Sequence, residues 1–82
     1  MGQQPATYRC PVCGQPGFSE PPWTDEDSAS FDICPACGIQ FGYNDARADV
    51  RDLVHRKWRE RWIANGRKPL HPWPTFDELL GE

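Results

Sequence analysis

Apolar residues recur with a helical period in the second half of the chain. Between residues 45 and 64, at about 100° per residue, one broad arc of apolar side chains emerges: Val50, Leu53, Val54, Trp58 and Trp62. Asn44 or Asp45 can cap the start of such a helix, and Asn65 with Gly66 can end it. The pattern therefore predicts one long helix over 45–64, whose apolar face packs on the rest of the protein.

The segments before this helix predict short strands and one exposed loop. Residues 31–33 and 39–43 alternate apolar and polar side chains, and residues 6–9 are expected to form a third strand. Residues 19–30 are rich in Pro, Asp, Glu and Ser, which indicates an exposed loop. Trp23 is the exception there, and we expect its indole either to pack down as a lid or to contact a partner.

The chain after the predicted long helix, residues 67–82, is too rich in proline for regular structure and too apolar to lie free. We expect it to wrap back across the domain and to insert Leu70 and Trp73 into the core. A Thr-x-x-Glu capping pattern then predicts a short helix over 76–80. At the other end, residues 1–5 are expected to be disordered.

The candidate chemistry lies in two CPxCG units, residues 10–14 and 34–38. Two Cys-x-x-Cys pairs separated by about 15 to 20 residues match the spacing of a tetrahedral zinc site. Disulfides are the alternative, but a reducing compartment favours metal ligation. The sequence predicts one Zn²⁺ per chain, with iron less favoured, and its ligands are Cys10, Cys13, Cys34 and Cys37.

Together these patterns predict a small α+β metal-bound fold with a single domain over 1–82. Two knuckles on short antiparallel strands would form a zinc ribbon over 6–43, covered by a long C-terminal helix and a Pro/Trp-rich tail. The first half has few apolar side chains besides cysteine. Its folding free energy must therefore come largely from the metal.

The net charge of −3 is unevenly distributed, because residues up to 45 are acidic and residues 46–68 are basic. The basic segment can face the acidic half of the protein or an external partner. The candidates for partner contact are Trp23, Arg47, Arg51, Arg56, Lys57, Arg59, Arg67 and Lys68. No apolar run approaches the roughly 18 residues of a membrane span, and no signal peptide is recognised. We therefore expect a cytoplasmic protein without a membrane partner.

The second CPxCG unit and its surroundings carry a family resemblance. Residues 30–45, SFDICPACGIQFGYND, residues 59–66, RERWIANG, and the Pro-Trp tail resemble small bacterial zinc-ribbon proteins similar to the cysteine-rich CPCC family. The resemblance covers nearly the whole chain and implies a zinc site without an established activity. Val12 and Ala36 stand where the CPCC signature would place adjacent cysteines, which leaves four ligands for one metal.

The favoured function is a non-catalytic zinc protein whose surface serves another macromolecule, in first place a protein. Four cysteines close the tetrahedron and leave no open position for a substrate, so the metal is expected to be structural. No catalytic set is recognised and no small-molecule substrate is inferred. His55 and His71 are expected to be surface or packing residues. We expect a monomer.

Nucleic-acid binding is a second hypothesis, because zinc ribbons often bind nucleic acids and the 47–68 segment combines cations with tryptophans. The acidic net charge argues against it. A third hypothesis is electron transfer, because two CPxCG units resemble the iron ligands of rubredoxins. The loop between the units is shorter than rubredoxins usually have, and they lack a long basic helix.

Overall fold

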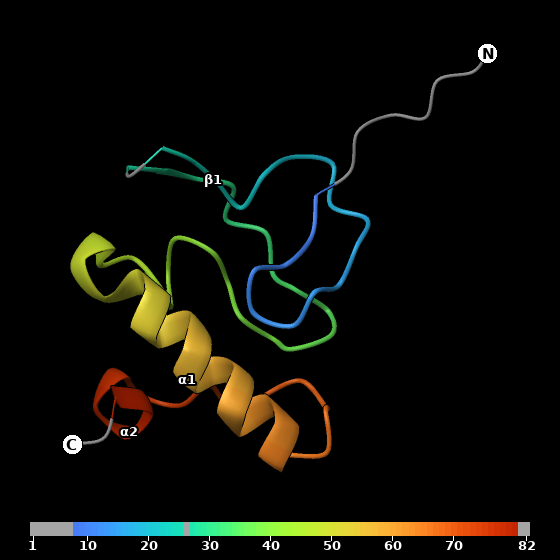
Figure 1. Cartoon of the computed structure of the whole chain (residues 1–82), viewed down its shortest axis with the longest axis vertical. Helices are drawn as coiled ribbons and strands as arrows, with labels where there is room; N and C mark the ends of the chain where they lie inside the picture. Colours follow the sequence, from blue (N-terminus) through green and yellow to red (C-terminus); the bar gives the residue numbers. More distant parts are fainter. Residues whose placement is uncertain (1–7, 26, 81–82) are drawn as a thin grey trace.

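A computed structural model describes residues 8–25 and 27–80 (Figure 1). Its regular elements, in chain order, are β1 (Trp23–Asp25), β2 (Ser28–Ala29), a 3-10 turn η1 (Ala48–Val50), α1 (Arg51–Ala64) and α2 (Phe76–Leu80). The loops before residue 45 lie along one side of α1, and α2 packs beside α1. The fold is thus a small α+β arrangement with a single two-stranded sheet in its described part. The disorder expected for residues 1–5 lies outside the described residues.

The sheet lies in the segment that the sequence predicted to be a loop. β1 and β2 are antiparallel, with Trp23 opposite Ala29 and Asp25 opposite Ser28. The predicted strands at 31–33 and 39–43 are wrong, since these segments share only an isolated bridge between Ile33 and Gln40. The pairing ends beyond Phe41, because the N–H groups of Tyr43 and Asn44 donate to the carbonyl of Gln40 in a turn. The predicted 6–9 strand, as far as it is described, is reduced to one bridge from Tyr8.

The long helix is shorter than predicted and is not C-terminal. α1 starts at Arg51 rather than 45, has 14 residues, and is followed by the 65–75 segment and α2. Asp45 does not cap it, because its carboxylate points into the protein and residues 48–50 form the 3-10 turn instead. At the other end, the N–H of Arg67 donates to the carbonyl of Trp62, which closes the helix near Asn65 as expected.

The core is formed between α1 and the two knuckles. Its fully buried apolar members are the α1 residues Val54 and Trp58 with Ile39, Phe41 and Val12 from the loops. Among the other aromatic and aliphatic residues near the knuckles, Tyr8, Phe31, Ile33 and Tyr43 are exposed. Burial of Val54 and Trp58 agrees with the helical arc read from the sequence.

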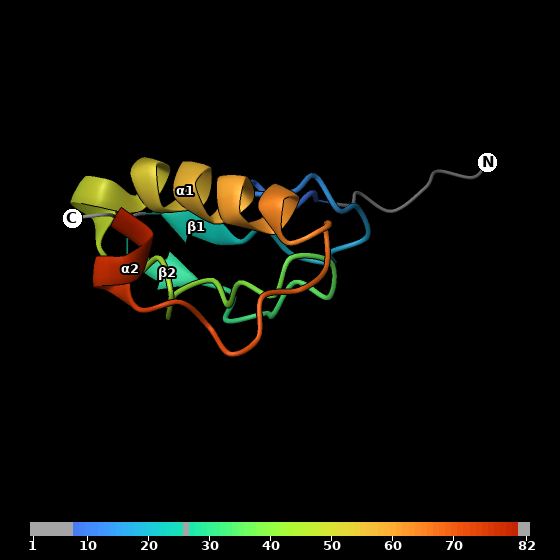
Figure 2. The same ribbon diagram turned by 90° about the horizontal axis from the view of Figure 1, so that it is seen from below.

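The tail runs along the second knuckle on the side opposite α1 (Figure 2). Leu70 is half-buried against the core, and its N–H donates to the carbonyl of Cys37 at 3.1 Å. Trp73 does not enter the core as predicted, because it is 36% exposed and only its indole N–H reaches inward. Within the described residues, no helix has the length and apolar character that crossing a membrane requires.

Candidate metal centre

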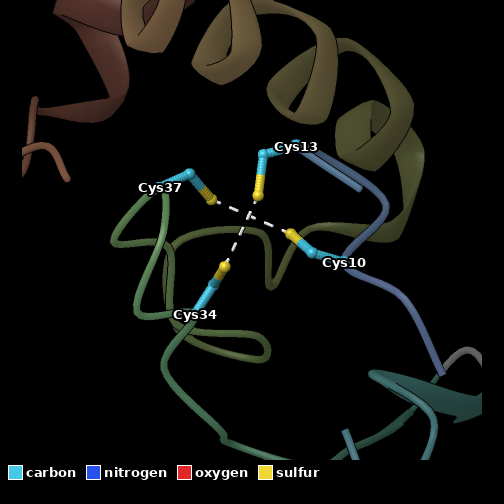
Figure 3. A group of neighbouring side chains, drawn as sticks. All are labelled: Cys10, Cys13, Cys34 and Cys37. Atoms are coloured by element: carbon cyan, nitrogen blue, oxygen red, sulfur yellow. Dashed lines mark hydrogen bonds between the residues drawn. The ribbon is translucent and has the colours of Figure 1, made fainter. Parts of the chain in front are cut away.

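The four cysteine side chains converge on one point (Figure 3). Their Sγ atoms all lie within 4.8 Å of one another, with Cys10 and Cys37 at 3.8 Å and Cys13 and Cys34 at 3.6 Å. Three of the residues are buried and Cys13 is half-buried. The structure therefore brings together all four cysteines that the sequence predicted as ligands.

These separations fit a metal ion and not disulfide bonds. A tetrahedron with metal–sulfur bonds of about 2.3 Å has edges of about 3.8 Å between sulfur atoms. The Cys13–Cys34 and Cys10–Cys37 edges, at 3.6 and 3.8 Å, agree with that length. A disulfide would need its sulfurs at about 2.05 Å, and all four cysteines are free. Four thiolates with no other donor at the centre can bind a thiophilic metal ion in a closed sphere.

The two CPxCG units build the site with the same local backbone. In each knuckle, the N–H of the glycine after the second cysteine donates to the carbonyl of the first cysteine, at 2.9 Å for Gly14 and 2.8 Å for Gly38. Both glycines have positive φ, near +84° and +88°, where a residue with a Cβ is strained. The N–H of Val12 points at the Sγ of Cys10, at 3.4 Å. Such N–H donors stabilise thiolates.

The packed thiols do not titrate independently. Hydrogen bonds from Cys10 and Cys37 lower the pKa of Cys34 far below that of an ordinary thiol. The adjacent Cys34 raises the pKa of Cys10, and Cys10 together with Cys34 raises the pKa of Cys37. Among these three thiols, Cys34 therefore loses its proton most readily. Only a bound cation offsets the repulsion among four thiolates, so metal binding must release protons.

Three tryptophans brace the second knuckle through consecutive backbone carbonyls. Trp62 donates its indole N–H to Ala36 at 2.8 Å. In the same way, Trp58 donates to the carbonyl of Cys37 at 2.9 Å, and Trp73 donates to that of Gly38 at 2.7 Å. The sequence predicted Trp58 and Trp62 as packing residues, but no pattern indicated these hydrogen bonds. They tie α1 and the tail directly to the peptide groups of the ligand-bearing turn, and they explain why indoles rather than phenyl rings stand here.

A buried carboxylate joins the β1–β2 hairpin to α1. Both oxygens of Asp45 are inaccessible to solvent; one accepts from the N–H of Gly42 at 2.7 Å, and the other accepts from Trp23 Nε1 at 3.1 Å and contacts His55 Nε2 at 2.6 Å. Burial alone would raise the pKa of Asp45, but the hydrogen bonds from His55, Gly42 and Trp23 outweigh it and hold that pKa below its usual value.

Sequence reasoning missed this contact. It considered Asn44 or Asp45 as a helix cap and expected His55 to be a surface or packing residue. Asp45 and His55 are ten residues apart, and no sequence motif links residues at that spacing. The sequence offered one weak indication of the contact, which is an acidic residue between a glycine-containing turn and a helix that carries a histidine.

Two of the partner-contact candidates, Trp23 and Arg51, are used within the protein. Trp23 is half-buried, donates to Asp45 and carries the guanidinium of Arg51 at 3.4 Å from its ring centroid. Arg51 also donates to the backbone carbonyls of Asp45 and Ala46, at 2.9 and 3.1 Å. This arrangement matches the alternative in which Trp23 packs down.

Two further cations of the basic segment are paired with acids. Arg47 contacts Asp49 at 2.7 Å, and the interaction lowers the pKa of Asp49. Lys57 lies 3.9 Å from Glu60, one turn along α1. Both pairs are largely exposed, so each contributes little to stability.

The remaining candidates lie on the surface. The guanidinium of Arg67 lies 5.9 Å from the ring centroid of Trp62. Lys68, Arg56 and Arg59 are exposed. The basic segment is therefore divided between cations that hold the fold and cations that face solvent.

Comparison with known proteins finds uncharacterised bacterial relatives. The chain is 32% identical to the protein YoaQ of Bacillus subtilis over 84 aligned positions, which cover 88% of this chain and 70% of YoaQ. It is also 32% identical to YozI of the same organism over 88 positions, which cover 92% of this chain and 72% of YozI. Both relatives are described only as uncharacterised proteins. No protein-family model and no solved structure matches the chain. The protein thus belongs to the family of YoaQ and YozI.

Proposed function

We propose that the protein holds one structural Zn²⁺ in its four-cysteine site and serves as a non-catalytic module for binding another protein. The observation that carries the metal assignment is the closed cluster of four convergent Sγ atoms. Four thiolates fill a tetrahedral sphere, so the ion has no position left for a substrate or an activated water. The resemblance to the CPCC-like zinc ribbons supports the same metal.

The surroundings of the cluster support a structural role for the ion. The knuckle carbonyls are tied to α1 and the tail by the indoles of Trp58, Trp62 and Trp73. A metal in that position connects the two loops to the helix that packs on them. Its contribution to folding is large, because the loops between residues 10 and 41 contain little regular structure and few buried side chains beyond the ligands.

The metal assignment is tested by replacing zinc with cobalt. Co²⁺ bound by four thiolates gives the intense d–d absorption of a tetrahedral site, and this absorption should appear at one equivalent per chain. Because the sphere is closed, azide or imidazole should leave the spectrum unchanged. A spectrum that changes with either ligand would reveal an open position and argue for a catalytic metal. A protein that carries iron and is red when isolated from its native host would instead support electron transfer.

The interaction role rests on exposed apolar side chains. Ile33, Tyr43 and Trp73 remain exposed around the second knuckle, and Tyr43 and Trp73 contact each other with ring centroids 5.3 Å apart. Large exposed apolar residues that lie together are more frequent at protein contacts than on inert surfaces. An affinity capture from the native host should recover a specific protein both with and without nuclease. A partner that is lost after nuclease treatment would replace this proposal with nucleic-acid binding.

A further inference from the structure

A polar pocket lies between the first knuckle and α1. It has a volume of about 340 Å³ and is lined by Pro11, Val12, Asp52, His55, Arg56 and Arg59. Four of these residues belong to α1. His55 and Arg56 lie three and four positions after Asp52, and Arg59 lies one turn further on, so the four share one face of the helix. The pocket is separate from the apolar surface around the second knuckle.

The two arginines of this pocket differ from Arg47, Arg51 and Lys57, whose side chains are paired within the protein. Among the residues that the structure describes, neither Arg56 nor Arg59 has a side-chain hydrogen bond or an ion pair. Asp52 lies four residues before Arg56, yet no ion pair forms between them at 4.0 Å or less. Two guanidinium groups, each with several N–H donors, are thus available at one pocket.

The imidazole of His55, a further polar group of the pocket, is held in place by Asp45. His55 is only 13% exposed, and its Nε2 lies 2.6 Å from the buried carboxylate of Asp45. Because Asp45 already accepts hydrogen bonds from Gly42 and Trp23, it is fixed and requires a proton on Nε2. The other ring nitrogen, Nδ1, therefore remains for a ligand. It accepts a hydrogen bond when the ring is neutral and donates one when the ring is protonated.

We propose that this pocket binds the terminal phosphate of a phosphate monoester. Arg56 and Arg59 donate to the phosphate oxygens, and His55 Nδ1 shares a proton with a third oxygen. A terminal phosphate carries between one and two negative charges near neutral pH and presents three oxygens, which matches two guanidinium groups and one imidazole.

A phosphodiester fits less well. It carries a single charge, and in a nucleic acid it belongs to a polyanion that the protein's net charge of −3 repels. Asp52, on the wall of the pocket, also repels an anion and limits the affinity. The same terminal phosphate chemistry occurs in small metabolites and in phosphorylated protein side chains.

The test is an NMR titration of the zinc-loaded, ¹⁵N-labelled chain with inorganic phosphate and, separately, with a short phosphoserine peptide. Saturable shifts are expected for the side-chain resonances of Arg56, Arg59 and His55. Binding of the peptide but not of its unphosphorylated form, more tightly than phosphate alone, would identify a protein source. Equal binding of peptide and phosphate would identify a small-molecule source, because the peptide then adds no contact.

Three variants make the result decisive. Arg56→Gln with Arg59→Gln should weaken phosphate binding by about tenfold or more, since charge-assisted hydrogen bonds contribute more than neutral ones. Arg67→Gln with Lys68→Gln removes the same charge away from the pocket and should change the affinity less than about twofold. Asp52→Asn should tighten binding, an effect that partial unfolding would not produce.

Three outcomes would overturn the proposal. They are the absence of saturable shifts in these side chains, equal weakening by the two double variants, and tighter binding of an oligonucleotide without a terminal phosphate at the same residues.

Discussion

The substitution Asp45→Asn examines the contact between the hairpin and α1. The side chain is fully buried and accepts from the Gly42 N–H and the Trp23 indole while contacting His55, at 2.7, 3.1 and 2.6 Å. Asparagine keeps the volume but replaces one oxygen by an NH₂ group, which cannot accept from Trp23 or Gly42. The remaining hydrogen bonds also lose their charge.

The expected loss can be worked from these contacts. A hydrogen bond to a charged group contributes about 1.5 to 3 kcal/mol, and at least one of the three is lost while the others weaken. The donor that loses its acceptor is also left buried without a partner, which costs about 1 to 3 kcal/mol. We therefore expect the free energy of unfolding of the zinc-loaded protein to fall by about 3 kcal/mol or more.

Urea unfolding followed by tryptophan fluorescence measures this change, with the zinc content of each sample determined in parallel. Asp49→Asn is the matched control, because it makes the same chemical change in an exposed pair with Arg47. It should leave the urea midpoint of unfolding almost unchanged, because the pair is exposed to solvent. If the Asp45→Asn variant retained its zinc and its free energy of unfolding lay within about 1 kcal/mol of the wild-type value, Asp45 would not connect the hairpin to α1 as described.

Two further substitutions examine the second knuckle. Gly38→Ala would place a Cβ 3.0 Å from the backbone of Leu70, whereas Gly14→Ala, at nearly the same φ in the first knuckle, would meet nothing within 4 Å. Thermal unfolding should therefore show a greater loss of stability for Gly38→Ala, by about 1 to 3 kcal/mol; equal losses would contradict the packing of the tail on this turn. Trp62→Phe removes the hydrogen bond to Ala36 while keeping an aromatic ring, and we expect a cost of about 1 to 2 kcal/mol in urea unfolding. No measurable change in the free energy of unfolding would show that the hydrogen bond from Trp62 to Ala36 does not stabilise the protein.

The convergence of the four cysteines was the part most readily predicted from the sequence. The spacing of two CPxCG units carries geometric information, because each knuckle has one preferred backbone and its two sulfurs must face the same way. The apolar arc of the helix was predictable for a similar reason, and Val54 and Trp58 are buried on it. Both inferences depend only on local geometry.

The strands and the start of the helix were not predictable in the same way. Residues 31–33 and 39–43 alternate like strands, but they pair only around the Ile33–Gln40 bridge, because the N–H groups of Tyr43 and Asn44 turn back to the carbonyl of Gln40. Asp45 has the composition of a helix cap, but its contacts with Trp23 and His55 come from segments 22 residues before and 10 residues after it. Tertiary contacts of this kind override local propensity and have no short-range signal.

The central claim is that one metal ion in the four-cysteine site organises the knuckles and the helix that packs on them. A stepwise Zn²⁺ titration of the metal-free chain, followed by ¹H–¹⁵N NMR spectra, tests it most directly. The spectrum should change from collapsed to dispersed for the residues between Cys10 and Phe41, and the change should be complete at one equivalent of zinc. A dispersed spectrum before zinc is added, or an end point other than one equivalent, would contradict the claim.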